Sequence, residues 1–328
     1  MSTALQKDKA AAPSRQPFAF RHEAALVFLL IAVLVLARIL APDFLAVGTQ
    51  LELLTHVYEI ALIALPMTLI IITGGIDLSV GSTMALSAVV LGLSFQAGLP
   101  VAVAALLAVV VGAAAGALNG WFVAYARVHP LLITLATLAA YRGIAEGISK
   151  AQPVSGFPAG FLSLSSGGFG GFTYPGMCFV AAALAAGILL SRTPFGLYLP
   201  AIGFNETATR LSGVAVARVK LLLYTLSGTA AGLAAVLFVA RRNTAKADIG
   251  TGIELDVIAM VVLGGTSIFG GRGRVIGTVL GVLLIHETRE FVSWHWNKDE
   301  LNLIVLGVLL IVSVLLNRLL SRRERETH

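Results

Sequence analysis

The side chains best placed to do chemistry lie in the string TGGIDLSVGS at residues 73–82, which separates two long apolar runs. The string begins with a glycine pair, Gly74 and Gly75, and adjacent glycines weaken a helix because ordering them has a high entropic cost. Asp77 and Ser79 follow, and either side chain can accept a hydrogen bond from free backbone N–H groups at the start of the next helix. The string therefore predicts a broken helix with a polar centre.

Two roles for these polar groups remain open. In the first, Asp77 only satisfies backbone N–H groups at a helix start. In the second, the broken helix lines a translocation route and its polar groups meet a hydroxyl-rich solute. The residues of this candidate route are Gly74, Gly75, Asp77 and Ser79. A carboxylate at membrane depth costs about 2.5–3.5 kcal/mol on insertion scales, so in either role Asp77 must face protein or water and not lipid.

A second glycine-rich string, GGTSIFGGRGR at residues 264–274, follows another apolar run. Glycine-rich loops can hold phosphate, but a P-loop needs the pattern G-x-x-x-x-G-K-[ST] after a strand. Neither Lys-Ser nor Lys-Thr follows this string, and the pattern occurs nowhere else in the chain. If the protein uses ATP, a separate subunit must therefore supply the ATPase.

Motifs for enzymatic chemistry are missing from the sequence, which contains no H-E-x-x-H, G-x-S-x-G or C-x-x-C. The single cysteine, Cys178, cannot form an intrachain disulfide. Four polar residues lie near the end of one apolar run: His286, Glu287, Glu290 and His295. We predict that they form a polar cluster at the membrane interface and not a metal site. We therefore expect no catalytic site, no metal and no cofactor.

The segment 192–219 joins two apolar runs and is too patterned for a plain linker. Asn205 can cap a short helix, and Gly213 can end it. The residues between them, ETATRLS, have mixed polarity. Such a helix can rest on lipid headgroups or fit a groove on a cytoplasmic partner, and the residues alone leave both open.

Composition places these strings in a membrane protein. Of the 328 residues, 57% are hydrophobic and only 12% are charged, whereas soluble domains carry about 25% charged residues. We therefore predict an all-α integral membrane protein, a polytopic bundle of about ten transmembrane helices, some of them broken. Each predicted span is close to the ~20 residues that cross ~30 Å of hydrocarbon. The apolar stretches are 24–41, 53–72, 81–97, 101–122, 131–149, 173–191, 220–240, 255–270, 275–293 and 302–317.

The distribution of Lys and Arg predicts the orientation, because these residues gather on the cytoplasmic side. With the N-terminus inside and ten crossings, fifteen of the 23 basic residues lie on the inner side. The prediction is a cytoplasmic tail at 1–22, a transmembrane domain at 23–318 and a second cytoplasmic tail at 319–328. Because the basic residues form short clusters between apolar runs, the net charge of +6 does not indicate nucleic-acid binding.

The loop at 150–172 is rich in Gly, Ser, Pro and Phe, and its composition predicts irregular structure on the outer side. It is either a loose connector or a docking or gating surface.

Four strings in order carry a family resemblance: TGGIDLSVGS, LNGWFVAYARVHPLLITLATLAAYRG (118–143), NETATRLSGVAVARVK (205–220) and ELDVIAMVVLGGTSIFGGRGRVIGTVLG (254–281). The chain resembles the ribose, rhamnose and autoinducer-2 class of ABC importer permeases over roughly residues 24–317. The resemblance implies a multi-pass protein of the bacterial inner membrane that is not an enzyme. It also implies three protein partners: a cytoplasmic ABC ATPase, a periplasmic sugar-binding protein and a second permease chain, identical or related.

In such permeases the inner loop between the sixth and seventh helices docks on the ATPase. Here that loop maps to about residues 203–213, so the resemblance favours the partner groove over lipid. The residues implied in coupling are Asn205, Glu206, Arg210 and Gly213.

Two other functions stay as alternatives. The first is an ABC permease for a branched-chain amino acid or a nucleoside. The second is an ion-coupled secondary carrier, which normally places paired ionisable residues deep among its helices. Asp77 is nearly alone at such depth in the sequence, apart from Glu146, and this argues against a carrier.

Overall fold

The computed structural model describes residues 17–169 and 172–296, together with positions 301, 304, 307, 308 and 311. These residues form an all-α bundle, as predicted. Its longer helices are α1 (Pro17–Leu40), α3 (Tyr58–Ile72), α4 (Val80–Gln96), α5 (Val101–Ala124), α6 (Pro130–Ser149), α8 (Tyr174–Arg192), α11 (Val216–Arg242) and α13 (Val275–Trp296). The shorter ones are η1 (Pro42–Leu45), α2 (Val47–Leu54), α7 (Ala159–Ser166), α9 (Phe195–Phe204), α10 (Glu206–Leu211) and α12 (Ile253–Leu263).

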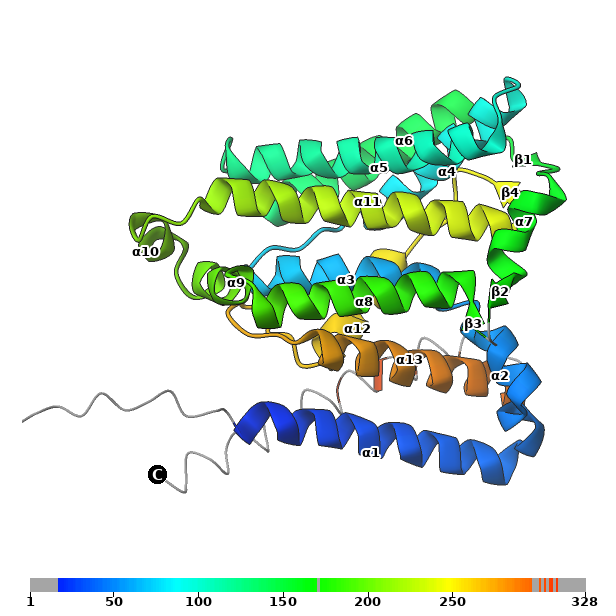
Figure 1. Ribbon diagram of the computed structural model, residues 1–328, viewed down its shortest axis with the longest axis horizontal. Helices are drawn as coiled ribbons and strands as arrows, with labels where there is room; N and C mark the ends of the chain where they lie inside the picture. The colour runs from blue at the N-terminus through cyan, green and yellow to red at the C-terminus, as the bar shows by residue number, and fades with distance from the viewer. Residues whose placement is uncertain are drawn as a thin grey trace, which may run out of the picture.

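The long helices run nearly side by side, and most short elements lie at the two ends of the bundle, whereas α12 lies inside it (Figure 1). Helix α10 projects from one end, where α1 also begins. The opposite end carries α2, α7 and two small sheets (Figure 1). This arrangement puts the segment 192–219 and the loop 150–172 at opposite ends, as the expected topology requires.

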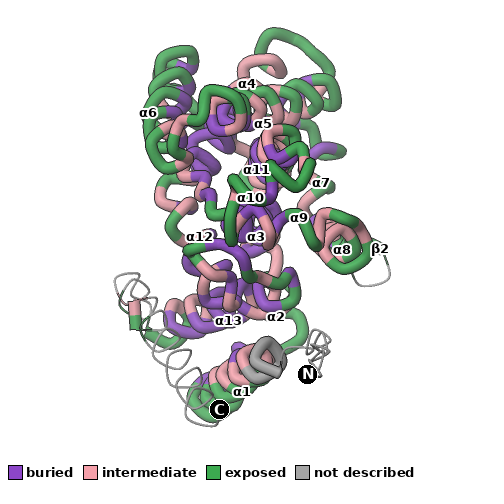
Figure 2. Tube along the Cα trace, turned by 90° about the vertical axis from the view of Figure 1, so that its left-hand side faces the viewer, coloured by how far each residue is buried: buried purple, intermediate pink, exposed green. Residues whose placement is uncertain are grey.

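The core of the bundle is built on α3, which packs against α11, α8 and α12. Every residue from Ala61 to Ile72 is buried, and a helix that is apolar all round is normally enclosed by other helices. The outer helices instead expose large apolar side chains, among them Phe28 (71% exposed) on α1 and Leu184 (62%) on α8. Figure 2 shows this contrast between a buried centre and an exposed rim. Such a rim suits a lipid environment.

Helices α5 and α11 pack closely because glycines line the contact between them. A Cβ atom added at Gly116 would overlap the Tyr224 carbonyl oxygen, and one at Gly228 would overlap the Gly112 carbonyl oxygen. Small residues let membrane helices approach until their backbones touch. The abundance of glycine in the sequence, 34 residues, thus has a direct structural use.

Nine of the ten predicted apolar stretches correspond to helices, while 302–317 lies largely outside the described residues. In the described part, five helices are long and apolar enough to cross a membrane, or six if α2 and α3, bent by 54°, form one span. The others fall short for physical reasons. Helix α4 has 17 residues and α12 has 11, and α13 carries Glu287, Arg289 and Glu290.

Helix α1 begins at Pro17, and the part of it that is long and apolar enough to span a membrane begins at His22, so the predicted end of the tail at residue 22 stays a prediction. Proline suits the first turn of a helix, where its missing N–H is not needed. The rest of that tail, and the tail at 319–328, lie outside the described residues.

The loop 150–172 is ordered where the structure describes it, so the prediction of irregular structure is wrong. Strand β1 (Val154–Ser155) pairs antiparallel with β4 (Thr244–Ala245), and β2 (Gly168–Phe169) with β3 (Phe172–Thr173). Phe157 is buried and stacks on Phe95 at 4.8 Å between ring centroids. The loop is therefore tied to α4 and to the end of α11, which excludes a loose connector.

Candidate functional site

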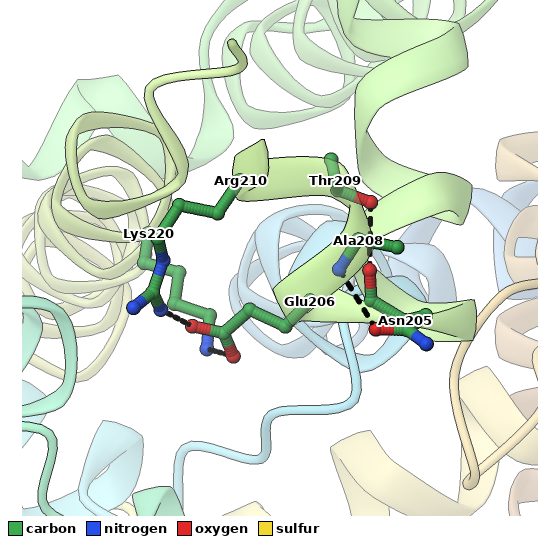
Figure 3. A network of polar contacts seen from close by, with 6 residues as sticks. All are labelled: Asn205, Glu206, Ala208, Thr209, Arg210 and Lys220. Carbon is green, nitrogen blue, oxygen red and sulfur yellow. Dashed lines mark hydrogen bonds and ion pairs between the residues drawn. The ribbon is translucent and has the colours of Figure 1, made fainter. Parts of the chain in front are cut away.

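Helices α9 and α10 form a hook between α8 and α11, and local signals set its ends. The Asn205 side chain accepts a hydrogen bond from the Ala208 N–H at 2.9 Å, which caps α10 (Figure 3). Gly213 adopts a left-handed conformation with φ of 89°, two residues after α10 ends. Both residues therefore have the structural roles that the sequence predicted for them.

Glu206 ties the hook to the base of α11. One carboxylate oxygen accepts a hydrogen bond from Arg210, one turn further along α10, and the other accepts one from Lys220 of α11 (Figure 3). Partial burial raises the pKa of Glu206, but the hydrogen bonds and charges of Lys220 and Arg210 outweigh this and hold the pKa below its ordinary value. The carboxylate therefore stays ionised, and the tether stays intact, throughout the neutral pH range.

Two large apolar side chains are exposed on the hook, among exposed polar residues. Leu211 is 85% exposed and Phe204 is 67% exposed. Glu206 and Arg210 are paired with each other, whereas Leu211 and Phe204 offer apolar surface to a partner. The sequence analysis missed both, because an apolar residue in a short loop carries no signal of its exposure.

Three glycine-containing segments meet where α9 ends, and we call this contact the glycine junction (Gly74, Gly203, Gly270 and Gly271, with the Ile72 carbonyl). The Gly271 N–H donates to the Ile72 carbonyl oxygen at 2.8 Å. A Cβ at Gly203 would overlap both of these groups, and one at Gly270 would lie 2.9 Å from the Gly74 nitrogen. The junction places the end of α9, within the hook, against the break in TGGIDLSVGS.

Asp77 is 2% exposed, and both of its carboxylate oxygens accept hydrogen bonds from protein groups. One of its oxygens accepts from the Ser79 backbone N–H at 3.0 Å and from the Ser79 hydroxyl at 2.7 Å, and the other accepts from the Ser227 hydroxyl at 2.9 Å. Asn119 donates to the Ser79 hydroxyl oxygen at 2.8 Å. Asp77 thus links the break to α11 and, through Ser79, to α5. These contacts support the first of the two roles considered for it.

The other two residues of the candidate route shape the backbone of the break. Gly74 has a left-handed φ of 79°, a conformation that residues with a side chain rarely adopt. A Cβ at Gly75 would lie 2.8 Å from the Tyr224 hydroxyl oxygen. The four route residues lie close together in the structure, and the four coupling residues lie together in the hook.

A family model described as "Branched-chain amino acid transport system / permease component" matches residues 49–314. The chain belongs to this permease family. It is 38% identical to the ribose import permease protein RbsC of Bacillus subtilis over 88% of this chain and 90% of the relative. It is 37% identical to the autoinducer 2 import system permease protein LsrD of Yersinia pseudotuberculosis over 78% of each. No solved structure matches the chain.

These comparisons confirm the resemblance to the ribose, rhamnose and autoinducer-2 class of ABC importer permeases. The protein is thus a multi-pass transport permease.

Two carboxylates of the permease are buried, which the sequence did not predict: Glu59, and Glu287 of the expected interfacial cluster. Glu59 is 3% exposed and accepts a hydrogen bond from Arg241 at 2.8 Å, and Glu287 is 7% exposed. Asp77 is therefore not alone among buried carboxylates, and family membership is the stronger argument against an ion-coupled carrier. In the expected interfacial cluster, Glu290 lies 3.5 Å from His56 and 4.0 Å from His286. Within the described residues, no three His, Cys, Asp or Glu side chains are placed to hold a metal.

Replacing Asp77 with Ala is expected to destabilise the permease, because the hydroxyls of Ser79 and Ser227 lose their acceptor inside the bundle. A buried polar group left unpaired costs about 1–3 kcal/mol. Asp77→Asn keeps an acceptor oxygen and should therefore lose less stability than Asp77→Ala. Thermal unfolding of the purified variants in detergent measures this order. If Asp77→Ala unfolds like the wild type but transports poorly, Asp77 instead acts on the solute.

Proposed function

We propose that the chain is the transmembrane permease subunit of an ATP-driven ABC importer that moves a monosaccharide across the bacterial inner membrane. The import functions in the names of its ribose and autoinducer 2 relatives support the sugar class. The chain has no P-loop, so a cytoplasmic ABC ATPase supplies the energy. A periplasmic sugar-binding protein delivers the solute, and a second permease chain completes the membrane dimer. Both termini lie in the cytoplasm.

The observation that carries this proposal is the physical link from the hook to the break. Asn205 caps α10 and Glu206 ties it to Lys220, so the hook moves as one unit with the base of α11. Two residues before the cap, Gly203 touches the Ile72 carbonyl and Gly271. A push on the hook from outside therefore reaches the glycine junction without passing through a flexible segment.

In this proposal the hook docks on the ATPase, and ATP binding and hydrolysis switch the permease between inward and outward openings. The ATPase must bind one hook position more tightly than the other, because equal affinity for both states would not shift the equilibrium between them. We propose that the break borders the translocation route, with Gly74, Gly75 and Ser79 nearest to it. Asp77 holds the shape of this border through its bonds to α4 and α11.

Leu211→Asp is expected to weaken association with the ATPase by at least about tenfold, because a charge buried in an apolar contact costs several kcal/mol. The matched control is Phe169→Asp, which makes the same kind of change on a side chain that is 80% exposed at the opposite end of the bundle. Co-purification of the ATPase with each variant is the measurement. Equal recovery of the ATPase with both variants would remove Leu211 from the docking surface.

The class of solute is tested separately. A branched-chain amino acid is the second candidate, because the family description names it. Vesicles containing the complete importer are offered labelled ribose, leucine and a nucleoside in parallel. We expect uptake of a monosaccharide, with ribose as the first one offered, and uptake of leucine instead would indicate the amino-acid class.

A further inference from the structure

A small cavity lies beside the hook, between α10, the start of α11 and the loop that joins α5 to α6. Its volume is about 250 Å³, below the roughly 300–1,000 Å³ of most small-molecule pockets. Such a space is large enough for a phosphate group. Its polar lining residues are Arg127, His129, Glu206, Arg210 and Lys220.

Positive charge is in excess around this cavity. Three cationic side chains, Arg127, Arg210 and Lys220, face a single carboxylate, that of Glu206. Both oxygens of Glu206 already accept from Arg210 and Lys220. None of the ion pairs formed within the described part of the chain includes Arg127. A guanidinium group matches the geometry of a phosphate with two parallel hydrogen bonds, so the cavity suits a phosphate.

The backbone conformation of Arg127 also supports a binding site at this cavity. Its φ is 55°, in the left-handed region that residues with a side chain rarely occupy. Such strain often accompanies a position whose side chain must be held at a site. Here it places the unpaired arginine at the rim of the cavity.

Two aromatic side chains place the cavity at the depth of lipid headgroups. Trp121 and Tyr125, at the end of α5, are each 50% exposed. Exposed Trp and Tyr gather at the boundary between hydrocarbon and water. Arg127 follows Tyr125 by two residues and lies on that boundary. Basic pockets between transmembrane helices at this level bind anionic lipid headgroups.

We propose that this cavity binds the phosphate of an anionic phospholipid, with Arg127 as its principal ligand and Arg210 and Lys220 as further donors. The bound phosphate competes with Glu206 for Arg210 and Lys220, and so loosens the tether between the hook and α11. That consequence rests on the proposed function of the hook, whereas the binding itself does not.

The test uses the full-length permease, purified in detergent and mixed with phosphatidylglycerol or phosphatidylcholine. Native mass spectrometry counts the lipids that each permease retains. We expect selective retention of phosphatidylglycerol and a loss of roughly fivefold in Arg127→Gln, since one basic residue near the headgroups contributes about that factor. Arg127→Lys keeps the charge and should retain most of the lipid. Thermal unfolding confirms that each variant is folded.

The matched control is Arg192→Gln. Arg192 is an exposed arginine that ends α8, and it does not line the cavity. This variant should retain phosphatidylglycerol at the wild-type level. Equal losses in Arg127→Gln and Arg192→Gln would overturn the proposal, as would equal retention of phosphatidylcholine. Displacement of the lipid by millimolar inorganic phosphate would also overturn it, because the cavity would then serve a free phosphate. The readout is binding, so a failure of the transport proposal leaves this result interpretable.

Discussion

Gly203→Ala is expected to abolish ATP-driven uptake while the permease remains folded in the membrane. The added Cβ would overlap the Ile72 carbonyl oxygen and the Gly271 nitrogen, which are themselves hydrogen-bonded at 2.8 Å. These are backbone atoms and cannot rotate away, so α9 must withdraw from the glycine junction. Overpacking of this kind costs about 1–3 kcal/mol, enough to favour a separated junction. The hook would then move without moving the break.

Uptake of the labelled sugar that the wild-type importer transports, per folded permease, measures this effect. Gly187→Ala on α8 is the matched control, because no atom lies within 4 Å of the added Cβ there. Its uptake should equal that of the wild type. If Gly203→Ala transports as well as Gly187→Ala, the glycine junction does not carry the coupling.

The second large effect is expected from Gly116→Val, which should remove most of the folded permease. Even a Cβ at Gly116 would overlap the Tyr224 carbonyl oxygen and lie 2.9 Å from the Gly228 nitrogen. Valine adds two further methyl groups at a contact where backbone faces backbone. Helices α5 and α11 must separate, and α11 also packs against α3 and α4 at the centre of the bundle.

Size-exclusion chromatography in detergent measures the folded yield, and thermal unfolding measures the stability of what remains. Gly143→Val, on α6, is the control, since the Cβ position there is open. It should give nearly normal yield. A wild-type unfolding temperature for Gly116→Val would show that the two helices are held apart in solution, contrary to the packing described above.

Features set by local sequence were predictable. Apolar runs mark helices because hydropathy is a property of consecutive residues. The cap at Asn205 and the left-handed turn at Gly213 were predictable for the same reason, since both depend on a few neighbouring residues. The break at Gly74 also follows from its own string.

Features that join distant segments were not predictable. Ser227 lies 150 residues from Asp77, and nothing in either string names the other as its partner. The pairing of β1 with β4 orders a loop that composition marked as irregular. The glycine junction joins three segments, and the sequence showed only that each contains glycine. The number of helices long enough to span the membrane was also not predictable from the sequence, because α12 is shorter than its apolar run.

The most direct test of the central claim is uptake by purified permease in proteoliposomes, with and without its ATPase. We expect the transported sugar to accumulate only when the ATPase, the binding protein and ATP are all present. We also expect Leu211→Asp to lower this uptake to the level seen without the ATPase. Full-speed uptake by the permease alone, unaffected by ATP, would contradict the account.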